Sequence, residues 1–253
     1  TYAGAPSVFD STVYINTPLT TDTQGNIFFG YSVTGANPAN LASGIARITP
    51  TGTVTYIDAA TMMGTPFARP VLNAAPALSA DQATLYMPVG TSSVLGGTQT
   101  PYLVALDSTT LARKASILLQ EPSGATAIAN ENGTSSPFVA PDGDVYYGVL
   151  GSTGGAHSVT GWLLHFDGNL SAAKTPGAFG WDNTPSLVPT SMVPSYTGMA
   201  SYLLMTKYNS YIDGQHRIAI LDPSQTQVDV NGGATVMKEV LTLRSPTPDV
   251  NNP

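Results

Sequence analysis

The sequence contains no cysteine, so disulfide bridges and thiolate metal sites are excluded. Charged residues make up 10% of the 253 positions, whereas roughly 25% is usual in globular proteins. Glu and Lys are scarce, with 3 and 4 residues, and long amphipathic helices need these helix formers on their solvent face. These shortages argue against a helical protein and against a small disulfide-stabilised one.

Basic residues are also few: nine Lys and Arg give a net charge of −7 and a pI near 4.6. A surface that binds nucleic acid needs clustered Lys and Arg, and Arg113-Lys114 is the only adjacent basic pair. No apolar run approaches the ~18 residues of a membrane span. We therefore expect no nucleic-acid partner and no insertion into a membrane.

What the sequence does contain is the composition of strands and tight turns. Gly (25), Pro (20), Tyr (12), Thr, Ser and Val are abundant, and 42% of the residues are hydrophobic. The sequence thus predicts an all-β fold with a sizeable core. Many Thr, Ser, Gly and Asn residues with few charges also resemble exported bacterial proteins, so we expect a secreted or periplasmic location.

One sequence unit occurs four times. Each copy begins with a small residue and a proline, continues into a turn with Asp or Gly, and then enters an aromatic-rich strand; the prolines are Pro18, Pro76, Pro137 and Pro185. A second apolar segment follows in each copy, then a polar turn and a further apolar strand, which in the third copy we expect from Leu170 to Ala173. The unit predicts four strands, of which the first is a short inner strand led by proline.

A four-stranded antiparallel sheet repeated in this way predicts a β-propeller, because one sheet cannot bury both faces alone. We expect a single propeller domain over residues 1–253, with four-stranded blades at approximately 17–58, 75–120, 135–176 and 183–243. The repeats leave open whether four blades close a ring or form part of a larger propeller.

The pattern Pro-x-Leu-x-x-Asp-Gly-x-Leu-Tyr, together with Val104-Ala105-Leu106-Asp107, resembles the quinoprotein-like (PQQ-like) propeller repeats of bacteria. The resemblance implies a propeller fold. The tryptophan-docking signature of those repeats is missing, and residues 108–112 take its place. Since the sequence has no acceptable match to the family's cofactor-binding residues, we predict no cofactor.

Aspartates recur at equivalent turn positions and are expected to cap those turns through backbone amides; they are Asp22, Asp81, Asp142, Asp107, Asp167 and Asp222. A hairpin turn accounts for Asp142-Gly143-Asp144. His165 lies in an apolar strand and is expected to be a satisfied interior or edge residue. The three histidines lack metal-ligand spacing, so no metal site is predicted.

Polar residues outside the repeat are the candidates for ligand binding, and those in loops before the inner strands are Arg69, Glu131, Trp181, Asp182 and Asn183. A Trp face beside carboxylate and amide groups can bind a sugar ring, and a lone Arg can bind a carboxylate. The alternative interpretation is that Trp181 packs between blades and that Arg69 pairs with Asp58 or Asp182. No catalytic residue is identified.

Three functions remain open. The leading hypothesis is a non-enzymatic exported module that binds a protein partner, a small molecule or a carbohydrate at the channel face. The first alternative is a carbohydrate-active hydrolase or lyase that uses channel-loop carboxylates, Asp182 with Glu131 or Asp10. The second is a structural fragment of a larger or split propeller whose missing blades come from another chain or segment; exposed apolar flanks on the first and fourth blades would support it.

Overall fold

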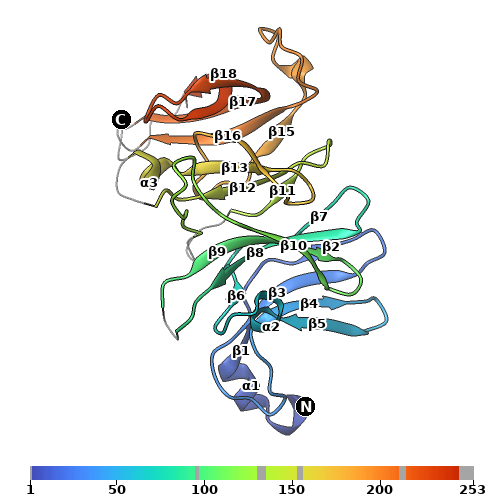
Figure 1. Ribbon diagram of the computed structural model, residues 1–253. Helices are drawn as coiled ribbons and strands as arrows, with labels where there is room; N and C mark the ends of the chain where they lie inside the picture. The colour runs from blue at the N-terminus through green and yellow to red at the C-terminus, as the bar shows by residue number, and fades with distance from the viewer. Residues whose placement is uncertain (1, 95–96, 130–134, 153–155, 211–214, 245–253) are drawn as a thin grey trace.

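The computed structural model describes residues 2–94, 97–129, 135–152, 156–210 and 215–244. These residues form four antiparallel sheets and a few short helices, which confirms the predicted all-β fold with four propeller blades (Figure 1). No helix in the described ranges is long and apolar enough to cross a membrane.

The sheets follow one another in chain order. The first contains β1 (Val13–Ile15), β2 (Thr20–Thr21), β3 (Ile27–Val33), β4 (Gly44–Ile48) and β5 (Val54–Asp58). The second contains β6 (Arg69–Pro70), β7 (Ala77–Leu78), β8 (Thr84–Thr91), β9 (Thr100–Asp107) and β10 (Arg113–Leu118). The third contains β11 (Phe138–Val139), β12 (Val145–Val149), β13 (Trp162–Phe166) and β14 (Ala173–Gly177). The fourth contains β15 (Ser186–Val188), β16 (Leu203–Ser210), β17 (Gln215–Val228) and β18 (Thr235–Arg244).

The helices are short and lie between or before the sheets. They are η1 (Tyr2–Gly4), α1 (Pro6–Thr12), α2 (Ala59–Met63), α3 (Ala156–Thr160) and η2 (Thr190–Met192). The helix α2 buries apolar side chains in a core shared by two sheets, through Ala59 and Met62. By contrast, α1 has no buried residue.

In the first two sheets the inner strand is split. β1 and β2 pair with different halves of β3, and β6 and β7 do the same along β8. Pro18 and Pro76 lie in the breaks, where the chain donates no ladder hydrogen bond. The short, proline-led inner strands predicted from the sequence are therefore present.

The proline-led segments of consecutive sheets contact one another directly. Asn73 donates its backbone N–H to the carbonyl of Asn16 (2.9 Å). Ala75 donates its N–H to Ser136 Oγ (2.9 Å), and Ser136 donates its N–H to Thr184 Oγ1 (2.8 Å). The inner strands of all four sheets thus lie side by side, as a propeller requires.

The four sheets form a row and not a closed ring within the described residues. Figure 1 shows the first sheet beside the N-terminal helix at one end and the fourth sheet at the other end. Within the described ranges, the first sheet consequently has one neighbouring sheet, the second, and the fourth sheet has one, the third.

The second, third and fourth sheets each turn one face to the sheet that precedes them in the chain. Strand-paired residues on that face are fully or almost fully buried; they are Leu85–Leu106, Val145–Phe166 and Leu204–Leu221. The pair at the same repeat position in the first sheet is Ile27–Ile48, and both residues are only half-buried. No sheet precedes them among the described residues.

One predicted strand begins later than expected. The last strand of the third sheet begins at Ala173 and not at Leu170, because Asp167 holds residues 169–172 in a turn. Its carboxylate accepts hydrogen bonds from the backbone N–H groups of Asn169, Ser171 and Ala172. Leu170 sits in this turn with φ of 53° and buries its side chain.

Candidate functional site

A pocket of about 360 Å³ lies between the third and fourth sheets. Its volume is within the range of small-molecule sites, roughly 300–1,000 Å³. We call it the third–fourth pocket; its lining comprises Asp142, Asp144, Tyr146, His165, Lys174, Thr175, Ala200, Ser201, Tyr202, Pro223 and Ser224.

The strand register brings three of these side chains into one row. Tyr146 of β12 is paired with His165 of β13, which is paired with Lys174 of β14. Directly paired residues of antiparallel strands point to the same side of a sheet. All three therefore lie on the face that the third sheet turns to the fourth.

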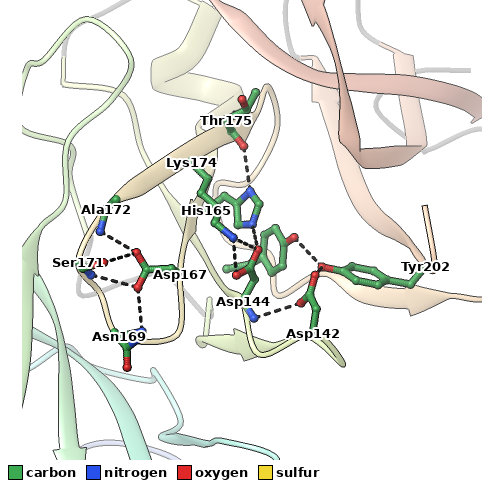
Figure 2. Close-up of polar contacts among 11 residues, drawn as sticks. Asp142, Asp144, His165, Asp167, Asn169, Ser171, Ala172, Lys174, Thr175 and Tyr202 are labelled. Carbon is green, nitrogen blue, oxygen red and sulfur yellow. Dashed lines mark hydrogen bonds and ion pairs between the residues drawn. The ribbon is translucent and has the colours of Figure 1, made fainter. Parts of the chain in front are cut away.

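Asp144 connects the row to the β11–β12 turn (Figure 2). Its Oδ2 lies 2.8 Å from His165 Nε2, and Lys174 Nζ lies 2.6 Å from Oδ1. The other ring nitrogen, His165 Nδ1, lies 3.2 Å from the carbonyl oxygen of Thr175. Asp144 and His165 are mostly buried, so the contact between carboxylate and imidazole is shielded from water, whereas the Lys174 side chain is 42% exposed.

A second chain of hydrogen bonds crosses from the third sheet to the fourth. Tyr202, which precedes β16, donates its hydroxyl to Asp142 Oδ2 (2.9 Å). The hydroxyl of Tyr146 lies 2.9 Å from Tyr202 Oη and, with that proton committed to Asp142, is the donor of the pair. The ring of Tyr146 stacks on His165 with 4.3 Å between ring centroids, so both networks share one wall of the pocket.

Burial governs the titration of these groups. Desolvation lowers the pKa of His165 below 6.5, although the hydrogen bond to Asp144 opposes this shift. Desolvation raises the pKa of both Tyr146 and Tyr202 above 10, and Asp142 raises both further; the hydrogen bond between the two tyrosines raises the pKa of Tyr146, the donor, and lowers that of Tyr202. The tyrosines therefore stay protonated, and the imidazole is neutral at pH 7.

This arrangement suits binding better than catalysis. Both ring nitrogens of His165 face protein oxygens, so neither is placed to take a proton from a ligand. With His165 neutral, two carboxylates and one ammonium give the pocket a net negative charge. Carboxylate oxygens, the Ser201 hydroxyl and the Pro223 ring offer hydrogen-bond acceptors, a donor and an apolar contact to a small ligand.

The repeat contains a signal that points to this site. Where the third sheet has His165, the other sheets have Arg47, Ala105 and Ile220. The position of Asp144 carries Asn26, Thr84 and Leu203 in the other sheets. The turn-capping role predicted for Asp142 is confirmed by its bond to the N–H of Asp144 (3.1 Å), and His165 is the satisfied interior residue expected. Their joint departure from the repeat was not recognised as a site.

The first and second sheets enclose a pocket of about 430 Å³ at the equivalent place. It is lined by turn residues, among them Asp22, Asn26, Arg47, Asp81 and Gln82. Asp22 caps its turn: burial opposes its ionisation, but hydrogen bonds from Asn26 and the backbone outweigh burial and lower its pKa. This pocket lacks the aromatic wall of the third–fourth pocket.

The residues predicted for ligand binding lie elsewhere. Arg69 is in β6 of the second sheet, whereas Trp181, Asp182 and Asn183 lie between β14 and β15. Glu131 falls outside the described residues. The structure thus brings Trp181, Asp182 and Asn183 together and leaves Arg69 in another sheet.

The segment 181–183 has contacts with its neighbours. Asn183 donates its side-chain amide to Thr206 Oγ1 (2.8 Å), and Lys207 Nζ lies 5.6 Å from the centroid of the Trp181 ring. Trp181 and Asp182 line a crevice of about 10 Å³, which has room for about one water molecule. Ligand binding by these residues stays a prediction.

The proposed enzyme pair has no support from the placement of Asp10. That residue lies in α1, at the first-sheet end of the row, and accepts a hydrogen bond from Tyr2 (2.9 Å). Asp182 follows the third sheet. Within the described ranges, no group of three or more His, Cys, Asp or Glu residues could hold a metal ion.

A second polar cluster joins three sheets but lines none of these pockets. His157 Nε2 lies 2.6 Å from Asp229 Oδ2, and its ring stacks on Trp162 at 3.5 Å. Trp162 donates its indole N–H to Glu121, which also accepts the hydroxyl of Ser152. Because Glu121 follows the second sheet and Asp229 follows β17, we interpret this cluster as structural.

No protein-family model matches the sequence, and no curated protein matches it. Among solved structures, an apocarotenoid oxygenase of Synechocystis is similar, with a TM-score of 0.45 and 11% identity over 90% of this chain. A luciferin-regenerating enzyme has a TM-score of 0.38 and 10% identity over 92%, and a gluconolactonase of Xanthomonas campestris has 0.33 and 14% over 90%.

This chain spans about half the length of the apocarotenoid oxygenase, 52% of that protein. Likenesses this remote support no inference about function. The fold assignment rests on the four sheets themselves, and the relationship to quinoprotein-like repeats stays a prediction.

Proposed function

We propose that the chain is a non-enzymatic propeller module, forming one domain, that binds a small, neutral, hydroxyl-rich ligand such as a sugar in the third–fourth pocket. The observation that carries the proposal is the departure of Asp144 and His165 from the repeat within a pocket of suitable size, where Lys174 also contacts Asp144. The other sheets have Asn26, Thr84 and Leu203 at the position of Asp144.

The charge and hydrogen bonding of the pocket indicate the ligand class. Asp142 and Asp144 can accept further hydrogen bonds from ligand hydroxyls, since each carboxylate oxygen has two lone pairs. The net negative charge disfavours anions. A bound sugar would donate hydrogen bonds to aspartate carboxylates that Lys174, His165 and Tyr202 already hold in place. These side chains would therefore lose little conformational freedom on binding.

The composition that favours an exported bacterial protein is compatible with such a role, because extracytoplasmic proteins meet free sugars. The location of the protein remains part of the proposal.

The test is titration calorimetry with a panel of neutral mono- and disaccharides. We expect at least one sugar to bind and to be recovered unchanged after long incubation. Ser201→Trp should fill the pocket and abolish binding, because Ser201 is an exposed residue of its lining. The matched control is Thr109→Trp, in the pocket between the first and second sheets, which should bind normally.

Two results would contradict the proposal. One is the absence of binding across the panel. The other is binding that survives Ser201→Trp and Asp144→Asn alike, since a ligand in this pocket would lose space in the first variant and charge in the second.

A further inference from the structure

The first sheet carries an uncovered apolar face. Register places large apolar side chains on the side away from the second sheet; six of them, which we call the open face, are Ile15, Ile27, Phe29, Ile48, Val54 and Tyr56, whereas Tyr31 on the same side is buried. Ile15, Val54 and Tyr56 are 61%, 55% and 54% exposed. Soluble monomers rarely expose large contiguous apolar patches, so such a surface marks an interaction site.

The other sheets show what covers such a face. At the same repeat positions, Leu85, Val145 and Leu204 are each 0% exposed because the preceding sheet packs on them. The opposite side of the first sheet behaves normally: Phe28 and Ile45 are 0% exposed and pack on the second sheet. The open face therefore has the composition of a sheet-packing surface without its sheet.

Part of the outer face of the fourth sheet is occupied by its own chain. Residues 189–200, which we call the cover segment, pack there. Val193 and Tyr196 of this segment pack with Leu203 and Ile220 of the sheet. Tyr196 also donates its hydroxyl to the buried Asp222 (2.7 Å), which ties the segment to β17. The cover segment thus occupies the fourth sheet around Leu203 and Ile220, whereas Ile218 and Leu243 of that sheet are 41% and 48% exposed.

We propose that the open face packs against the open face of a second copy of this chain, forming a two-fold dimer. When the same surface of two chains packs face to face, the assembly stops at a dimer and does not grow into a filament. Charge favours the pairing as well. The chain carries a net −7, but in register with the six apolar residues the first sheet has one charged side chain, Asp58, at the end of β5.

The test is sedimentation of the whole chain over a wide concentration range. We expect a monomer–dimer equilibrium that Tyr56→Lys weakens by at least about tenfold, because it places an ammonium group in an apolar contact. This substitution also makes the chain less negative, so general charge repulsion cannot explain a weaker dimer. The matched control is Val228→Lys, at a 67% exposed apolar residue of the fourth sheet, which should leave the equilibrium unchanged.

A cross-linking measurement distinguishes the arrangements of two copies. The chain has no cysteine, so Val54→Cys introduces a single thiol. In the face-to-face dimer, mild oxidation should link two such chains, whereas Val228→Cys should stay unlinked. A chain that is monomeric at all concentrations would overturn the proposal and leave a sheet of another polypeptide as the occupant. A dimer insensitive to Tyr56→Lys and not linked through Val54→Cys would also overturn it, in favour of head-to-tail association.

Discussion

The outer faces of the first and fourth sheets, at the two ends of the row, differ in how they are covered. At the fourth sheet, the cover segment folds back over the outer face, and Leu203 and Ile220 are 0% and 4% exposed. At the first sheet, no other sheet of the described residues packs on the outer face, and Val54 and Tyr56 are more than half exposed. The exposure of equivalent residues thus depends on whether another sheet or segment packs on their face.

The largest expected effect compares one repeat position in a covered and an uncovered setting. Leu106→Ala should lower the free energy of unfolding by about 2–5 kcal/mol, because Leu106 is fully buried between the first two sheets. Ile48→Ala, at the equivalent half-buried position, should cost less than about 1.5 kcal/mol in the monomer. Urea unfolding of both variants at high dilution provides the measurement. Equal losses would mean that the open face is buried in solution.

A smaller effect concerns the attachment of the cover segment. Tyr196→Phe removes the hydroxyl that donates to Asp222 and accepts from the N–H of Ala200. We expect a loss of about 1–2 kcal/mol, since Asp222 is fully buried and loses one donor. Tyr56→Phe on the open face is the matched control and should change stability by less than about 0.5 kcal/mol. Similar values for the two would show that the cover segment is not held by this bond.

The smallest effect is a pH dependence of the contact between the third and fourth sheets. Burial lowers the pKa of His165 in the folded chain below its value of 6.5, so the unfolded chain binds more protons between the two values. The stability that the neutral imidazole contributes is present above pH 6.5 and is lost as pH falls through the lower, folded-state pKa. Unfolding measured from pH 7.5 to 5 should show this decline.

His165→Gln should flatten that decline, because Gln does not titrate. The carboxylates with lowered pKa, such as Asp107 and Asp167, change stability only at more acidic pH, below their usual value of 3.8. An unchanged slope in the His165→Gln variant would assign the decline to other groups.

The repeat predicted the sheets well because its prolines and apolar residues lie at the positions that packing requires. The prolines at 18, 76, 137 and 185 and the paired apolar runs mark inner strands and covered strands, and both are local features of the sequence. The predicted turn-capping aspartates follow the same logic; Asp107, for example, accepts the backbone N–H groups of Thr109 and Thr110. Such local patterns predict the structure well because every blade has the same order of strands and turns.

The third–fourth pocket was harder to predict because its residues come from separate segments. Asp144 follows a turn, His165 and Lys174 lie on two later strands, and Tyr202 belongs to the next sheet. Only the register across β12, β13 and β14 brings the first three together. The packing of the cover segment could not be predicted from the sequence either, because it depends on which sheet face lacks a neighbouring sheet.

The central claim, that equivalent positions are fully buried in three sheets and only half-buried in the first, can be measured directly in a chain without cysteine. Four variants, Ile27→Cys, Leu85→Cys, Val145→Cys and Leu204→Cys, place one thiol at the same repeat position of each sheet. At high dilution and native pH, the thiol of Ile27→Cys should react with a thiol reagent at least about tenfold faster than the other three, because reaction requires exposure. Equal, slow reaction at all four positions would contradict the account.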